Sequence, residues 1–318
     1  MSVMAIVKDT DDKRRGRRAV IFSLLLLSVS VAVVILGGAR VGEYFTLGLD
    51  MAARRVLPTA FPFMILSSLV CCMIDPVFYS YMEGPLGALF GLGGAGGAPL
   101  IVGNLTGFPI GARMTAELCL AGAIDRDDGE RLSAYASNPS PAFVVGAVGE
   151  GLLGDRSLGV MLLLSLYAAV VLSALIYRGK SRKIKNTYEI CRQKYGFVAS
   201  IKDAATSSLY MLAFVSFFYI ITSAVRDAVK PAALAAIIIA LTEVTGAVSY
   251  AATEGIFSPF ARVGIIAFSL GFGGLSVLAQ VAAVTECAKL RLTKYIKIKL
   301  TEGLISALIA MGFFYIFG

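Results

Sequence analysis

The sequence predicts an all-α polytopic membrane protein, and three observations support this fold class. Of the 318 residues, 57% are hydrophobic and 16% are charged, whereas soluble domains average about 45–50% apolar and about 25% charged residues. The apolar residues extend along the whole chain, whose length suffices for about seven to nine spans at about 20 residues each. Several apolar stretches contain glycine, proline and polar residues at their centres, which indicates discontinuous helices buried in protein.

The first elements of the chain predict one span that precedes the rest of the architecture. Residues 19–39 form an apolar run longer than the 7–15 residues of a typical signal-peptide core, so we interpret this run as an uncleaved first helix. Residues 40–57 mix apolar and charged residues at helical spacing and predict an interfacial helix. Residues 1–57 form the first region of the chain.

The first half, residues 58–177, combines ordinary spans with two broken segments. Residues 84–123 are rich in glycine and contain Asn104-Leu-Thr-Gly-Phe-Pro-Ile-Gly-Ala-Arg113, which predicts a discontinuous helix that crosses the membrane. Residues 132–151 contain Ser137-Asn-Pro-Ser-Pro141. Because prolines stop a helix, we expect a re-entrant hairpin with its tip there. The ordinary spans are residues 58–76 and 158–177.

The second half, residues 203–318, repeats this order after a basic linker at residues 178–202. A span at residues 231–252 is interrupted at Thr242-Glu-Val-Thr-Gly-Ala247, and a second re-entrant segment at residues 261–285 is broken by glycines. Each half then has three spans plus a hairpin, so the two halves form an inverted repeat, which is typical of transporters with a midplane site. The ordinary spans are residues 204–224 and 300–317.

The net charge of +8 is concentrated in three basic clusters beside apolar stretches, at residues 8–18, 178–202 and 289–299. Clusters of this kind set orientation by the positive-inside rule. We therefore expect lipid and no nucleic acid as a partner. The rule places the N-terminus and all three clusters in the cytoplasm, and it places the acidic loop at residues 125–131 outside.

Histidine and cysteine usage limits the chemistry of the chain. There is no histidine, which removes imidazole metal sites and histidine acid–base catalysis. The five cysteines show no metal-ligand spacing, so we expect no metal, no disulfide and no cofactor. The chain also lacks a Gly-x-Ser-x-Gly motif and paired aspartates at helix midpoints, and we expect no enzymatic activity.

Two ionisable residues lie inside interrupted spans. Arg113 offers a permanent cation whose planar fork matches a carboxylate; the alternative is an ion pair with Glu117 one helical turn on. Glu243 is a carboxylate at the centre of a span and is a functional candidate by default, as the binding group for a coupling Na+ or H+. Its alternative role is a buried ion pair.

Three motifs resemble those of YlbJ-like sporulation integral membrane proteins, of the nucleoside-recognition (Gate) group that is similar to concentrative nucleoside transporters. These motifs are Gly107-Phe-Pro-Ile-Gly-Ala-Arg113, Glu130-Arg-Leu with Ser137-Asn-Pro-Ser-Pro-Ala-Phe143, and Gly273-Gly-Leu-Ser-Val-Leu-Ala-Gln280. The resemblance implies a multi-pass protein of the cell membrane, or of a membrane around the forespore. It implies transport of a small anionic or heterocyclic metabolite, dipicolinate first. The alternatives are a nucleoside or nucleobase carrier and a non-transporting sporulation scaffold, and self-association as a homo-oligomer stays open.

The resemblance also implies where the substrate binds. The implied positions are Gly107, Pro109, Gly111, Arg113, Ser137, Asn138, Thr245, Gly246, Gly274, Ser276 and Gln280, together with Glu243. The helix breaks themselves add Asn104, Thr106 and Ser140. Half-helix N-termini at such breaks attract anions. For Asn104, Asn138 and Gln280, capping of a broken helix is the alternative role.

Overall fold

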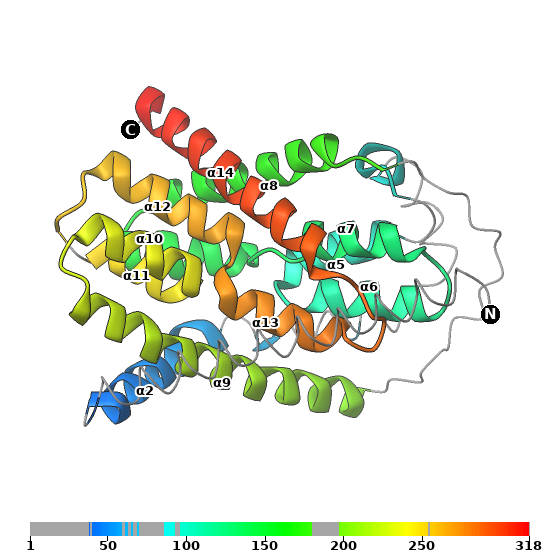
Figure 1. Cartoon of the computed structure of the whole chain (residues 1–318), viewed down its shortest axis with the longest axis horizontal. Coiled ribbons are helices and arrows are strands. Elements are labelled where there is room, and N and C mark those ends of the chain that lie inside the picture. The colour runs from blue at the N-terminus through cyan, green and yellow to red at the C-terminus, as the bar shows by residue number, and fades with distance from the viewer. Residues whose placement is uncertain are drawn as a thin grey trace, which may run out of the picture.

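The computed structural model describes residues 38, 40–58, 61–62, 65, 69, 86–92, 96–179, 197–253 and 255–317. Every secondary-structure element in these ranges is a helix (Figure 1), which confirms the all-α prediction. The predicted span at residues 19–39, most of the span at 58–76 and most of the linker at 178–202 lie outside the described residues.

The helices follow one another along the described chain, and η1 and η2 are wound in the wider π form. They are α2 (Arg40–Met51), η1 (Ala52–Val56), α5 (Gly97–Thr106), α6 (Ile110–Leu120), α7 (Arg126–Tyr135), η2 (Ala142–Leu153), α8 (Arg156–Ile176), α9 (Phe197–Ala228), α10 (Ala232–Thr242), α11 (Val244–Thr253), α12 (Pro259–Phe272), α13 (Gly274–Thr285) and α14 (Leu292–Phe317).

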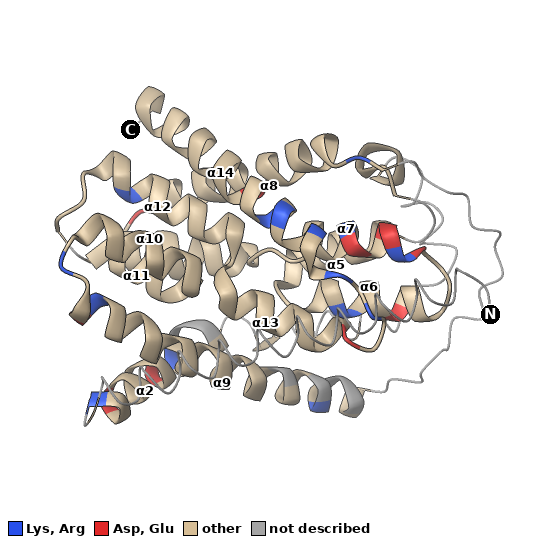
Figure 2. Cartoon of the chain, in the orientation of Figure 1, with Lys and Arg blue, Asp and Glu red and all other residues tan. Residues whose placement is uncertain are grey.

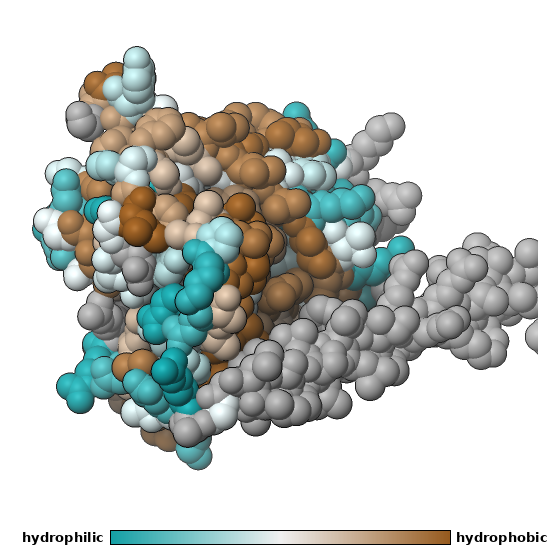
Figure 3. All heavy atoms as spheres, turned by 60° about the vertical axis from the view of Figure 1, so that its left-hand side comes forward, coloured by the Kyte–Doolittle hydropathy of each residue, from teal (hydrophilic) through white to brown (hydrophobic). Residues whose placement is uncertain are grey.

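Four helical segments of the described chain are long and apolar enough to cross a membrane. They are Arg156–Ile176, Ala204–Ala228, Pro259–Thr285 and Leu292–Phe317. Figure 3 shows a broad hydrophobic surface on one face of the protein. Large apolar side chains such as Leu209 and Leu308 are exposed, as expected where helices contact lipid.

The first helix break reverses the direction of the chain. α5 and α6 pack along each other, and a Cβ built on Gly103 would lie 2.7 Å from the Gly111 Cα atom. In a continuing helix, eight residues would separate these glycines by about 12 Å. α5 and α6 are therefore a helical hairpin, hairpin A, with its tip at residues 106–109. The prediction that residues 84–123 form one crossing helix was wrong.

α10 and α11 form a second hairpin, hairpin B, with its tip at Glu243. The two helices lie side by side in Figure 1, and one apolar cluster joins Ala236 and Ile239 of α10 to Ala247 and Tyr250 of α11. Small side chains allow this close approach. The expected crossing span at residues 231–252 was therefore also wrong, because its break turns the chain back.

The two segments expected to fold back instead continue across the protein. Within the described residues, neither α7 and η2 nor α12 and α13 pack along each other. In Figure 1, α13 extends the path of α12 toward the opposite end of the molecule. The breaks at residues 136–141 and at Gly273 are thus interruptions within crossing segments. Proline and glycine ended these helices as expected, but they do not decide whether the next helix turns back.

The acidic start of α7 and the basic start of α14 lie at the same end of the protein (Figure 2). Asp127 contacts Lys294, and the Arg291 backbone N–H donates to Glu130 Oε1 at 3.1 Å. The expectation that residues 125–131 and 289–299 lie on opposite sides of the membrane was wrong. Acidic residues contribute little to the positive-inside rule, and here the two charge clusters pair with each other.

Candidate functional site

A cavity of about 40 Å³ lies where both hairpin tips and both helix breaks meet. At this volume it holds about three water molecules. Its lining combines hydroxyl groups, one amide and one carboxylate with aromatic and aliphatic side chains. The lining residues are Thr106, Gly107, Phe108, Pro139, Ser140, Phe143, Met211, Val215, Glu243, Val244, Thr245, Ser276, Val277 and Gln280.

Each hairpin tip lies against the break of the crossing segment in its own half. A Cβ built on Gly107 would lie 3.3 Å from the Ser140 backbone N, and one built on Gly274 would lie 3.0 Å from the Glu243 backbone N. Both glycines adopt positive φ, +91° and +76°, a conformation that glycine adopts without steric cost. Each half therefore contributes one close backbone contact of the same kind beside the cavity.

Glu243 is fully buried at the tip of hairpin B, where its carboxylate faces the N-terminus of α11. Its Oε1 accepts a hydrogen bond from the Thr245 N–H at 2.8 Å, and its Oε2 accepts one from the Gly246 N–H. Free N–H groups and the helix dipole stabilise a carboxylate at this position. Among the described residues, no lysine or arginine lies within ion-pair distance of Glu243, so the alternative of a buried ion pair is not seen there.

Arg113 does not line the cavity. It lies on α6, where its Nε is 3.2 Å from Glu117 Oε1 and its side chain is 39% exposed. This is the alternative that the sequence left open. The structure brings Thr106, Gly107, Ser140, Glu243, Thr245, Ser276 and Gln280 together around the cavity. Asn104, Pro109, Gly111, Ser137, Asn138, Gly246 and Gly274 are not among the residues that line the cavity.

A chain of buried polar side chains lies behind the first break. Asn138 Nδ2 donates to Asn104 Oδ1 at 2.9 Å. Lys299 Nζ donates to Asn138 Oδ1 and to Glu302 Oε2, both at 2.6 Å. At the far end of the chain, Ser173 Oγ donates to Glu302 Oε1 at 3.1 Å. This chain connects hairpin A and the first break to α14 and α8.

Sequence reasoning missed Lys299 and Glu302. It assigned Lys299 to a basic loop at residues 289–299 that flanks a span, but α14 begins at Leu292 and Lys299 is only 1% exposed. The sequence contained a pattern that indicates a shared polar face, because Lys299, Glu302 and Ser306 recur at helical spacing on one side of α14. All three side chains are buried.

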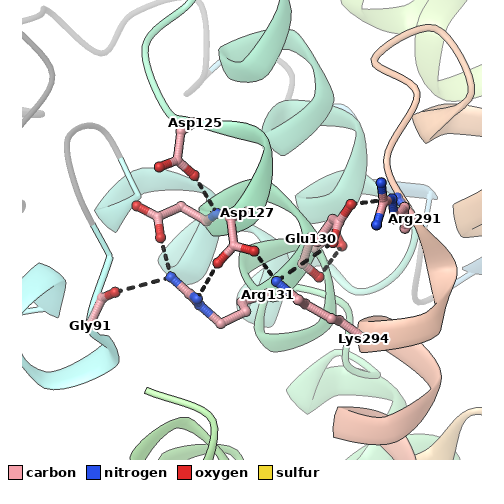
Figure 4. A network of polar contacts seen from close by, with 9 residues as sticks. Gly91, Asp125, Asp127, Glu130, Arg131, Arg291 and Lys294 are labelled. Carbon is pink, nitrogen blue, oxygen red and sulfur yellow. Dashed lines mark hydrogen bonds and ion pairs between the residues drawn. The ribbon is translucent and has the colours of Figure 1, made fainter. Parts of the chain in front are cut away.

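A second polar network lies at the end of the protein (Figure 4). Arg131 contacts Asp128, and its Nη1 donates to Asp127 Oδ2 at 2.7 Å. Lys294 contacts Asp127 and lies 3.8 Å from Glu130 Oε2. The hydrogen bond from Lys294 holds the pKa of Asp127 below its ordinary value. The network joins the start of α7 to the start of α14.

Comparison with known proteins gives one informative similarity. No protein-family model matches the chain, and no solved structure matches it. The chain is 27% identical over 308 aligned positions to the sporulation integral membrane protein YlbJ of Bacillus subtilis (strain 168), and the alignment covers 83% of this chain and 75% of that relative. No match supports the expected relation to the nucleoside-recognition (Gate) group. The similarity to YlbJ confirms the resemblance to YlbJ-like sporulation integral membrane proteins that three sequence motifs indicated.

Proposed function

We propose that this protein transports a small solute across a membrane by alternating access at the cavity between the two hairpins. One observation carries the proposal: the cavity is lined by both hairpin tips and both helix breaks. Discontinuous helices that meet near the bilayer midplane form the substrate sites of many secondary transporters. The similarity to an integral membrane protein supports a membrane location.

The order of elements supports an inverted repeat, with an assignment of hairpins different from the one expected. In the first half, hairpin A precedes the interrupted pair α7–η2 and then α8. In the second half, hairpin B precedes the interrupted pair α12–α13 and then α14. The two hairpins enter from opposite ends of the molecule in Figure 1. Movement of a hairpin relative to the rest of the protein would then open the cavity toward one side of the membrane.

The lining favours a small, flat heterocyclic solute. Phe108 and Phe143 offer aromatic faces, while Ser140, Ser276 and Gln280 offer hydrogen-bond donors and acceptors. A volume of about 40 Å³ is far below the roughly 300–1,000 Å³ of a typical ligand pocket. A solute of this kind therefore fits only when the elements that line the cavity move apart.

We include a coupling cation in the proposal because the ionisable residue that lines the cavity, Glu243, is acidic. Arg113 lies away from the cavity, whereas the Glu243 carboxylate lines it. An anionic solute next to Glu243 requires Na+ or H+ at that carboxylate to limit charge repulsion. Dipicolinate, which the resemblance implies, is our first test solute. A nucleoside is the second, because the aromatic and amide groups also suit an uncharged base.

Uptake by proteoliposomes tests the proposal. Radiolabelled dipicolinate and uridine are supplied separately, each under an inward Na+ gradient and under an inward H+ gradient. Glu243→Gln and Thr245→Val change groups that line the cavity, and we expect both variants to lose uptake.

Thr253→Val is the matched control for Thr245→Val. Thr253 is exposed on the same helix, and its hydroxyl donates to Ser249 O at 2.8 Å, so this variant should retain uptake. Equal loss in both valine variants would refute the site. Absence of uptake for every solute and gradient by the folded protein would refute transport and favour the scaffold.

A further inference from the structure

The two hairpins are held to the rest of the protein by different kinds of contact. Among the described residues, polar contacts from hairpin A to its neighbours are numerous, whereas hairpin B packs through a large apolar cluster. We propose that Lys299 is a positioning residue that fixes hairpin A to α14, so that hairpin B is the moving gate of the cavity. This inference rests on the proposed transport function, because only a transporter requires a gate.

Three polar contacts tie Asn104 of hairpin A to neighbouring elements. Asn104 Nδ2 donates to Tyr135 O at 2.9 Å, Asn104 Oδ1 accepts from Asn138 at 2.9 Å, and Asn104 O accepts from Tyr167 on α8 at 3.0 Å. Gly103 and Gly111 of the same hairpin close around the Ala136 carbonyl, where a Cβ on either glycine would overlap the oxygen. Hairpin A therefore cannot shift without breaking several hydrogen bonds at once.

Lys299 extends these ties to the last helix. Its side chain is 1% exposed, and its ammonium group donates to Asn138 and to Glu302 at 2.6 Å each. Glu302 is fully buried and also accepts from Ser173. Separating a buried charge from its partner leaves the charge unpaired in a medium of low polarity, which is strongly unfavourable. Asn138 is thereby held in place, and it holds Asn104 in turn.

The network of Figure 4 joins α14 to α7, the helix that precedes the first break, at a second place. Lys294 at the start of α14 contacts Asp127 and lies 3.8 Å from Glu130, both on α7. The Arg291 backbone N–H donates to Glu130 at 3.1 Å. α7 and α14 are therefore joined at the end of the protein and again beside the break. Together with α8 they form the fixed group of helices to which hairpin A is attached.

Hairpin B shows contacts of another kind. The polar groups of Thr242, Glu243 and Thr253 form hydrogen bonds inside the hairpin itself. Toward its neighbours, hairpin B presents an apolar cluster that packs against Val225, Phe257, Ile265 and Phe268. Apolar contacts have no preferred direction, so this apolar surface can slide past its described neighbours more easily than the polar contacts of hairpin A can separate.

Distance measurements between spin labels test this asymmetry without any solute. The five native cysteines are replaced by serine, and cysteines are introduced at exposed positions. Leu105→Cys with Leu164→Cys reports hairpin A against α8, and Ile237→Cys with Leu304→Cys reports hairpin B against α14. In nanodiscs we expect one narrow distance population for hairpin A and two for hairpin B.

Variants then test the role of Lys299. Lys299→Met with Glu302→Met removes both buried charges, so the fold is retained without an unpaired charge, and Asn104→Leu breaks the tie with no change of charge. Each should add a second distance population to hairpin A. Lys297→Met is the matched control, because Lys297 is exposed on the same helix, and it should leave hairpin A unchanged.

The results that overturn the inference are equally specific. These are two populations for hairpin A in the unaltered protein, one population for hairpin B, or an unchanged hairpin A in the Lys299→Met, Glu302→Met variant. The distances report hairpin motion whether or not a solute is carried. A failed uptake assay would therefore refute transport without altering this result.

Discussion

Replacing Lys299 by methionine removes one member of a fully buried ion pair and leaves Glu302 with Ser173 as its remaining partner. At the observed separation of 2.6 Å, the attraction between the two charges is about 6 kcal/mol at an effective dielectric constant of about 20. Part of this is offset, because the ammonium group no longer has to be removed from water. Loss of one partner of a buried pair typically costs about 3–5 kcal/mol, and we expect Lys299→Met to destabilise the protein by that amount.

The assay is unfolding in mixed micelles with increasing SDS, followed by circular dichroism. Lys297→Met should stay within about 0.5 kcal/mol of the unaltered protein, as expected for an exposed position. Lys299→Met combined with Glu302→Met should recover most of the loss, because an apolar pair can replace a buried ion pair at little cost. A Lys299→Met protein as stable as the unaltered one would refute the pairing. So would a double variant no better than the single one.

Three further predictions address other parts of the molecule. Gly103→Ala places a Cβ against the Ala136 carbonyl and should destabilise the protein by about 1–3 kcal/mol in the same SDS titration. The control is Gly146→Ala, because the space around Gly146 is open. Equal losses of stability in the two variants would contradict the packing of hairpin A. Gln280→Leu removes an amide from the cavity lining. It should raise the KM for uptake by about fivefold to a hundredfold, equivalent to about 1–3 kcal/mol, and an unchanged KM would exclude contact with the solute. The pKa of Asp127 is held low in the folded state, so its contribution to stability is present at neutral pH and is lost progressively as the pH falls below about 4. Asp127→Asn should therefore cost under about 1 kcal/mol at pH 7 and less in acid, and a cost that grows as the pH falls would contradict this direction.

The positions of the helix breaks could be predicted, but the path of the chain through them could not. Pro139, Pro141 and Gly273 end helices because of their own backbone chemistry, which local sequence reveals. Whether the next helix turns back depends on side-chain packing between the two arms. Gly103 and Gly111, placed symmetrically about Gly107, carried that information in the first half.

The predicted residues at the helix breaks line the cavity more often than the charged residues do. Thr106, Ser140, Thr245 and Ser276 all reach the cavity, because they lie at the helix ends that meet there. Arg113 does not reach the cavity, and its guanidinium group instead pairs with the exposed Glu117 one helical turn away. Lys299 was misassigned because the positive-inside rule counts a lysine near a span as solvated, and only three-dimensional packing shows it to be buried.

The capping of α11 has a consequence for any anion that reaches the cavity. The N–H groups of Thr245 and Gly246, which would otherwise receive a carboxylate, are already occupied by Glu243. The Glu243 carboxylate therefore competes with any bound anion for the same two N–H groups. An arriving carboxylate gains these donors only when the Glu243 side chain moves away. The neutral Glu243→Gln side chain repels an anion less, so this variant should bind anions more tightly than the unaltered protein.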